Sequence, residues 1–209
     1  MTVTTLLLFS IVALVTIATP GPTVLLALSN GSRYGVRRAL PGMLGAVASD
    51  IVLVTAVALG LGALLAASEF WFSALKWVGA AYLAWLGLQL LRSKGGFEVP
   101  FGDQPNPQHR ARKVFMKSFL VAVTNPKGYL FCSALMPQFI DPSAAQLPQH
   151  VAVGSVFCTV DFSVMLAYAF VGARAIELLK ASAVRWVDRI CGGTLLALAA
   201  SLAFYRRAN

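Results

Sequence analysis

The chain has 209 residues, of which 58% are hydrophobic and only 12% are charged. A soluble domain carries roughly 25% charged residues, and half that share cannot cover a globular surface in water. The composition therefore excludes an ordinary soluble domain and predicts an all-α integral membrane protein that faces the lipid bilayer. The formal net charge is +9, and the lysines and arginines that produce it lie mostly between the apolar runs. They are not interleaved with aromatic residues, as they would be on a surface that binds nucleic acid. Nucleic acid is not an expected partner.

Six stretches are long and apolar enough to form transmembrane helices, each of which needs about 20 residues. These stretches are 4–28, 41–66, 72–91, 118–137, 151–173 and 187–205. No Lys or Arg precedes Arg33, and the first stretch is too long for a signal-peptide core, so we expect it to be the first span. The last stretch is the least regular, because Asp188 and Arg189 lie in its first turn. The polar segment 92–117 contains glycines and prolines and is predicted to be a loop.

Lysine and arginine collect in alternate connections between the predicted spans. One set comprises Arg33, Arg37, Arg38, Arg92, Lys94, Arg110, Arg112, Lys113, Lys117, Arg174, Lys180, Arg185 and Arg189. The positive-inside rule assigns this set to the cytoplasm and both termini to the outside of the plasma (inner) membrane. Arg206 and Arg207 in the tail weigh against this orientation.

The predicted spans fall into two halves with matching features. Thr19-Pro20-Gly21-Pro22 in the first half corresponds to Thr124-Asn125-Pro126-Lys127 in the second, Asp50 to Asp161, and Lys76-Trp77-Val78 to Arg185-Trp186-Val187. Each half holds three spans, so the second half must be inserted upside down relative to the first. The sequence thus predicts two inverted three-helix repeats, 1–95 and 118–209, with helices 1 and 4 broken and a cytoplasmic linker at 96–117. Inverted repeats with broken helices are typical of secondary transporters.

Proline lacks an N–H group, so the two breaks leave backbone carbonyls without their helical donors. Pro20 and Pro22 free the carbonyls of Thr16 and Ala18, and Pro126 frees that of Ala122. The N-terminus of a half-helix suits a carboxylate, and freed carbonyls suit an ammonium group. The predicted substrate contacts are Thr19, Pro20, Gly21, Pro22, Thr23, Asn125, Pro126 and Lys127. The alternative interpretation is an ordinary proline kink in each helix.

Three charged residues lie near the middle of a predicted span: Asp50, Lys127 and Asp161. A central charge costs about 2.5–3.5 kcal/mol on insertion scales, so such residues usually face the protein interior and have a function. Asp50 and Asp161 could bind and release protons, or could hold a substrate ammonium. Lys127 could neutralise an aspartate or meet a substrate carboxylate. The alternative is a structural ion pair.

Other chemistries find less support in the sequence. Cys132, Cys158 and Cys191 are widely spaced and are predicted to be packing residues. A thiol relay would need a cysteine in each broken helix, and the first has none. A metallohydrolase would need clustered ligands, but His109 and His150 lie in separate loops. The chain also lacks a phosphate-binding loop. We expect no enzyme, catalytic residue, metal or cofactor.

Small residues recur at four-residue spacing in two of the spans, which lets helices approach closely. The sets are Gly193, Ala197 and Ser201 and, more loosely, Gly45, Ser49 and Leu53. We expect both to pack within the bundle, with a homo-oligomer interface as the alternative.

The chain resembles the LysE/RhtB family of amino-acid exporters over nearly its whole length. The matching elements are Thr19-Pro20-Gly21-Pro22, Gly35 with Arg37 and Arg38, Asp50, the run from Leu75 to Gly87, Asn125-Pro126-Lys127, and the run from Pro137 to Pro142. The resemblance implies six spans and efflux of amino acids or close derivatives by exchange with protons. It implies a translocation site at the two breaks, Asp50 and Asp161. A channel for ions or small solutes is the alternative function.

Overall fold

The computed structural model describes residues 1–60, 69–92, 107–179 and 181–204. Within these ranges every regular element is a helix, which confirms the all-α prediction. The elements are α1 (Val3–Ala18), α2 (Pro22–Tyr34), α3 (Val36–Ala58), α5 (Glu69–Leu91), α6 (Pro107–Val123), α7 (Pro126–Leu130), a π-helix η1 (Phe131–Leu135), a 3₁₀-helix η2 (Met136–Phe139), α8 (Gln146–Leu179) and α9 (Ala181–Phe204).

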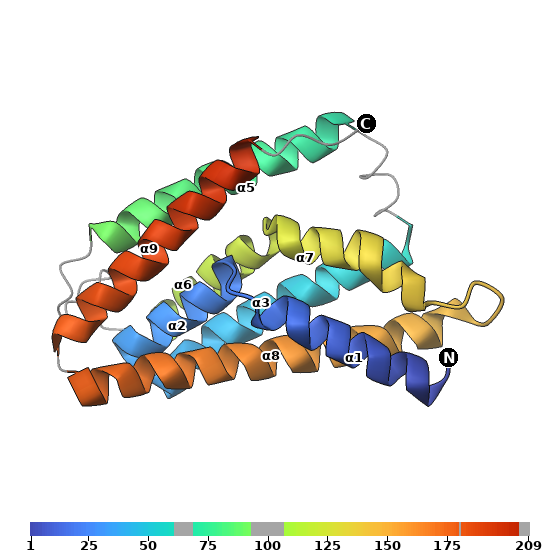
Figure 1. Cartoon of the computed structure of the whole chain (residues 1–209), viewed down its shortest axis with the longest axis horizontal. Helices are drawn as coiled ribbons and strands as arrows, with labels where there is room; N and C mark the ends of the chain where they lie inside the picture. The colour runs from blue at the N-terminus through green and yellow to red at the C-terminus, as the bar shows by residue number, and fades with distance from the viewer. Residues whose placement is uncertain (61–68, 93–106, 180, 205–209) are drawn as a thin grey trace.

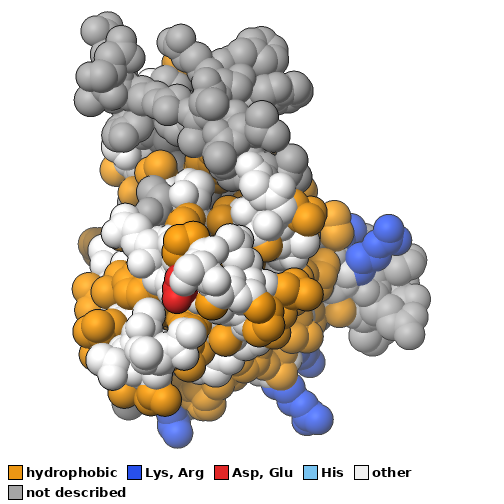
Figure 2. Space-filling model, turned by 90° about the vertical axis from the view of Figure 1, so that its right-hand side faces the viewer, with side chains coloured by type: hydrophobic (Ala, Val, Ile, Leu, Met, Phe, Trp, Pro, Cys, Tyr) orange, Lys and Arg blue, Asp and Glu red, His pale blue; other side chains and the backbone are white. Residues whose placement is uncertain are grey.

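The helices run up and down along the long axis of the molecule (Figure 1). At one end α2, α5 and α8 finish and α3, α6 and α9 begin. We name this the basic end, since Arg33, Arg37, Arg38 and Arg92 lie at these helix termini. The opposite, distal end carries the N-terminus (Figure 1). Hydrophobic and uncharged side chains cover much of the distal end, and Lys and Arg side chains appear only at its rim (Figure 2). The cytoplasmic location of the basic end stays a prediction.

Several helices have the length and apolarity that a membrane span requires. In the described part of the chain, α3 and residues Gln146–Ala175 of α8 each pass this test. Helices α1 and α2 pass it together, with a bend of 62° at the break between them. Large apolar side chains such as Leu7, Val15 and Phe170 are exposed, as expected for a surface that faces lipid. The further division into six spans and inverted repeats stays a proposal.

The observed helix boundaries differ from the predicted spans in two places. The predicted loop 92–117 is wrong from Pro107 onward, where α6 begins. Proline fits the first turn of a helix, and no glycine or proline follows before the end of α6, so the polar composition here marks a polar helix end. Helix α3 ends at Ala58 because Gly60 takes φ 77°, a left-handed conformation that favours glycine.

Part of the sequence prediction lies outside the described residues. This part comprises 61–66 of the second predicted span, Lys94, the repeat boundary near residue 95, 96–106 of the predicted linker, Lys180 and the tail arginines.

The buried apolar residues form two clusters. The central cluster joins α1, α2, α3, α8 and the segment after α7, with Phe9, Met43 and Phe157 among its members. The α5–α9 cluster joins Leu83 and Leu86 of α5 to residues of α9 and α2. The described bundle therefore has a central body and a peripheral α5–α9 pair.

Glycines form the closest helix crossings. A Cβ atom at Gly31 of α2 would collide with the backbone of Ala169 of α8, and one at Gly172 of α8 with the carbonyl of Leu28. A Cβ at Gly45 of α3 would collide with the Phe115 carbonyl of α6. Such contacts let backbones meet where a larger residue would hold them apart.

We expected both sets of small residues to pack within the bundle, and this is right for the set in α3 and wrong for the set in α9. Gly45 and Ser49 are buried inside the bundle. In α9 the stripe of Gly193, Ala197 and Ser201 is exposed, and a Cβ at Gly193 would meet nothing within 4 Å. The α5–α9 crossing is instead formed by Gly87 of α5 and Gly192 of α9, because the face of α9 that carries Gly192 is the one turned toward α5.

Candidate functional site

The first helix break falls at the predicted proline motif. Helix α1 ends at Ala18, Thr19 and Gly21 are extended, and α2 begins at Pro22. The Ala18 carbonyl, freed by Pro22, accepts a hydrogen bond of 2.9 Å from the Tyr168 hydroxyl of α8. The neighbouring Thr19 carbonyl accepts one of 2.6 Å from Nζ of Lys127. Side chains from the second half of the chain thus satisfy backbone groups that the break exposes.

The second break falls at Thr124 and Asn125, between α6 and α7. The Asn125 side chain caps α7, since its Oδ1 accepts the Lys127 N–H at 3.1 Å. The Ala122 carbonyl, freed by Pro126, accepts the Asn125 N–H at 3.0 Å. The chain continues as a π-helix and a 3₁₀-helix, irregular forms that are frequent near functional sites.

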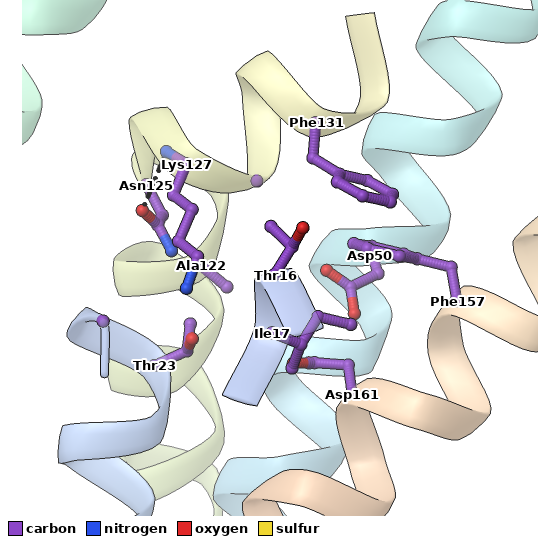
Figure 3. Close-up of a pocket in the computed structure, with 12 residues that line it drawn as sticks. Thr16, Ile17, Thr23, Asp50, Ala122, Asn125, Lys127, Phe131, Phe157 and Asp161 are labelled. Carbon is purple, nitrogen blue, oxygen red and sulfur yellow. Dashed lines mark hydrogen bonds between the residues drawn. The ribbon is translucent and has the colours of Figure 1, made fainter. Parts of the chain in front are cut away.

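The two breaks meet at a small cavity of about 30 Å³. Its lining comprises Thr16, Ile17, Gly21, Thr23, Asp50, Ala122, Asn125, Lys127, Gly128, Phe131, Phe157 and Asp161 (Figure 3). Six of the predicted site residues are therefore brought together: Gly21, Thr23, Asp50, Asn125, Lys127 and Asp161. Thr19 contributes its carbonyl to Lys127, Pro20 is exposed, and Pro22 and Pro126 begin the half-helices.

Asp50 of α3 and Asp161 of α8 form an acidic pair on one side of the cavity. Each is 6% exposed, and the two side chains are close enough to interact electrostatically. Two carboxylates this close repel each other, so a proton or another cation stabilises the pair. Oδ2 of Asp50 is buried without a hydrogen-bond partner among the described residues. The pair therefore has a free acceptor beside the cavity.

The opposite side of the cavity is positively charged. The Lys127 ammonium lies over the first break, 3.7 Å from the position of a Cβ on Gly21. The N-terminus of α2 begins there, and the capping residue Gly21 gives it no side-chain hydrogen bond. A helix N-terminus carries a partial positive charge, so it adds to the charge of Lys127.

Figure 3 shows how these groups lie. Lys127, Asn125 and Thr23 lie to one side of the end of α1, and the acidic pair lies to the other. Phe131 and Phe157 lie beside Asp50, with ring centroids 5.0 Å apart and nearly parallel. The cavity thus presents a cationic and an acidic side with an aromatic wall.

Sequence reasoning missed Tyr168 and the two phenylalanines. A hydroxyl in an apolar span is a signal that could have identified Tyr168, since it needs a partner in lipid. Phe131 and Phe157 carry no such signal, because phenylalanine is common in every span.

A second buried charge cluster lies between α2 and α9, toward the basic end. Nε and Nη2 of Arg33 donate to Oδ1 and Oδ2 of Asp188 at 2.9 and 2.7 Å. The Ser29 hydroxyl donates to the same Oδ1 at 3.1 Å. Lys117 of α6 is near enough for electrostatic interaction with both charges. The sequence signal was Asp188 itself, a lone acid at the start of an apolar helix.

Comparison with known proteins gives independent evidence on the family of this chain. The model of a family described as LysE type translocator matches residues 14–206. An uncharacterized membrane protein of Vibrio cholerae is 34% identical over 168 residues, 80% of each chain. A homoserine/homoserine lactone efflux protein of Salmonella typhimurium is 33% identical over 90% of this chain and 91% of its own. A leucine efflux protein of an Enterobacter species is 28% identical over 77% of this chain and 76% of its own. No solved structure matches.

Apolar helices that are interrupted at a shared, charged cavity define a membrane transport protein. The family match over most of the chain makes the assignment specific: the chain belongs to the LysE type translocator family. It is an efflux transporter of the inner membrane and not an enzyme. The resemblance stated from the sequence motifs is confirmed.

Proposed function

We propose that this transporter exports a small amino acid or a close derivative by proton antiport. The observation that carries the proposal is the opposite charge on the two sides of the cavity, with Lys127 on one side and Asp50 and Asp161 on the other. An amino acid is a zwitterion and presents both charges within a few ångströms. Its carboxylate meets Lys127 and the N-terminus of α2, and its ammonium group meets the acidic pair.

The relatives support the same class of substrate. Two relatives are named for efflux of homoserine or homoserine lactone and of leucine. Homoserine and leucine are therefore the first substrates to test.

Coupling to protons follows from competition for the acidic pair. Two neighbouring carboxylates repel each other, so the acidic pair holds one proton when no substrate is bound. An arriving ammonium group displaces this proton, because both cations are stabilised by the same carboxylates. Proton and substrate then occupy the site in turn. The site carries the amino acid outward and the proton inward.

The proposal is tested with the purified chain in liposomes. Vesicles that contain homoserine, leucine or lysine at a lower concentration than the medium are given an acidic exterior, and amino-acid movement against its own gradient is measured. We expect uphill export that stops when the pH gradient is collapsed. A channel would give only downhill flux, and absence of flux for every amino acid would reject the proposal.

A further inference from the structure

The ion pair of Arg33 and Asp188 lies outside the cavity and connects two parts of the bundle. Both side chains are shielded, with 11% of Arg33 and 1% of Asp188 exposed. The guanidinium group binds both carboxylate oxygens, and Ser29 adds a third hydrogen bond. A buried ion pair contributes little net stability, because the loss of hydration offsets the attraction. We therefore look for a role of the Arg33–Asp188 pair other than stabilising the fold.

The pair joins the central body to the peripheral α5–α9 pair. Arg33 lies in the last turn of α2, which belongs to the central body, and Asp188 lies near the start of α9. Leu25 and Leu26 of α2 share an apolar cluster with Cys191 and Leu195 of α9, which continues the same interface. In Figure 1, α9 begins close to the end of α8 and diverges from it along its length. Rocking of one packed unit against another is a common form of alternating access.

The two ends of the central body differ in how tightly they are packed. Toward the basic end, Gly31 meets Ala169 and Gly45 meets Phe115 through backbone atoms. Toward the distal end, a groove of about 610 Å³ lies between the end of α3 and the start of α8, with Thr55, His150 and Cys158 in its lining. Asp50 lines the cavity and its neighbour Ile51 lines the groove. The close backbone crossings thus lie toward the basic end, and neighbouring residues of α3 line the cavity and the groove.

We propose that Arg33 and Asp188 form a latch that holds the basic end of the translocation pathway closed, and that release of this latch lets the α5–α9 pair swing away from α2. The inference rests on the proposed transport function. Arg33 and Asp188 act as positioning residues, since neither lines the cavity. The described conformation is the one with the latch closed.

Two native cysteines report the two sides of this motion. Cys191 is fully buried at the α2–α9 interface, three residues after Asp188. Cys158 is half-buried and lines the groove. Two single-cysteine proteins are made, one with Cys132→Ala and Cys158→Ala, the other with Cys132→Ala and Cys191→Ala. Each is reconstituted as the full chain, and its rate of alkylation by N-ethylmaleimide is measured.

Latch variants are compared in both backgrounds. We expect Asp188→Asn to raise the alkylation rate of Cys191 by about fivefold or more and to lower that of Cys158, as is typical of a conformational coupling. The effect of Arg33→Gln is smaller, because Asp188 then still faces Lys117, whereas Asp188→Asn leaves two cations facing each other. Arg33→Lys gives an intermediate rate, since a lysine keeps the charge but lacks the two-pronged geometry. Arg37→Gln, an exposed arginine at the same end, is the matched control and leaves both rates unchanged.

A purely structural pair would behave differently. Loosening of the fold would raise the alkylation rates of Cys191 and Cys158 together, and that result would overturn the proposal, as would unchanged rates at both cysteines. The readout does not depend on the substrate, so an absence of amino-acid transport would reject the proposed function and leave this result standing.

A cross-link gives a second measurement if a charge variant does not accumulate. Arg33→Cys and Asp188→Cys are combined in a chain without the native cysteines and joined by a flexible bis-methanethiosulfonate reagent, each end of which forms a reducible disulfide with one thiol and releases methanesulfinate. We expect efflux to stop on cross-linking and to recover on reduction. Full transport by the cross-linked protein would contradict the latch.

Discussion

At the scale of single residues, the acidic pair is the group on which coupling depends. Asp50 and Asp161 come from different helices, are almost fully buried and line the same cavity. A carboxyl group binds and releases a proton, whereas an amide of the same shape does not. The pair therefore lends itself to a substitution that changes charge and leaves volume nearly constant.

We predict that Asp50→Asn abolishes proton-driven export without lowering the amount of inserted protein. Loss of a hydrogen bond to a charged group costs about 1.5–3 kcal/mol, so uphill efflux should fall about tenfold or more. The measurement is efflux under an imposed pH gradient, normalised to protein in the membrane. Ser49→Ala is the matched control, since the Ser49 hydroxyl is buried without a partner in the described structure and its removal costs little. Normal gradient-driven efflux by Asp50→Asn would reject the proton or ammonium role.

A second prediction concerns the cationic side of the cavity. Lys127→Gln removes the charge proposed to meet the substrate carboxylate, so the variant should lose preference for an amino acid over its amide. We expect the ratio of the two apparent affinities to fall about tenfold, the equivalent of one charge-assisted hydrogen bond. Competition assays with the amino acid and its amide measure this ratio. An unchanged ratio would restrict Lys127 to its bond with the Thr19 carbonyl.

The sequence predicts a site residue when its side chain differs in chemical character from the apolar residues around it. Asp50, Lys127 and Asp161 were found because a charge stands out in an apolar span, and the structure brings all three to one cavity. Phe157 could not be found, because its position depends on which helix face turns inward. The partner of Asp188 could not be found either, since Arg33 is 155 residues away along the chain.

At the scale of elements, the two breaks are the best-predicted features, because proline removes a backbone donor whatever its surroundings. The helix ends were harder to predict. The polar residues after Pro107 indicated a loop, yet they form the first turns of α6. The apolar residues near Gly60 indicated a continuous span, yet the positive φ of that glycine ends α3.

We predict that Pro22→Ala slows transport more than it lowers the yield of folded protein. Alanine restores an N–H group that can compete with the Tyr168 hydroxyl for the Ala18 carbonyl, so the 62° bend is no longer enforced. Transport rate per inserted molecule and the yield of monodisperse protein are the two measurements. A lower yield with unchanged specific activity would mean that Pro22 is an ordinary kink.

At the scale of the whole molecule, the bundle depends on glycines at the points where helices cross. Sequence spacing suggested such contacts, but it selected the wrong face of α9, because a four-residue repeat does not reveal which side of a helix faces inward. The structure separates contact glycines from exposed ones. Gly172 of α8 touches the backbone of α2, whereas Gly193 of α9 faces open space.

This difference gives a matched pair of substitutions. Gly172→Ala puts a methyl group against the Leu28 carbonyl, a backbone atom that cannot turn away, so α2 and α8 must separate. Overpacking of this kind costs about 1–3 kcal/mol, and we expect a clear drop in the temperature at which the purified protein unfolds or aggregates. Gly193→Ala adds the same methyl group to a helix of the same bundle without a collision, and alanine favours the helix by about 1 kcal/mol. It should therefore be neutral or stabilising. Equal losses for both variants would mean that the α2–α8 crossing is not as close as described, and that Gly193 is covered by another surface, such as a second copy of the chain.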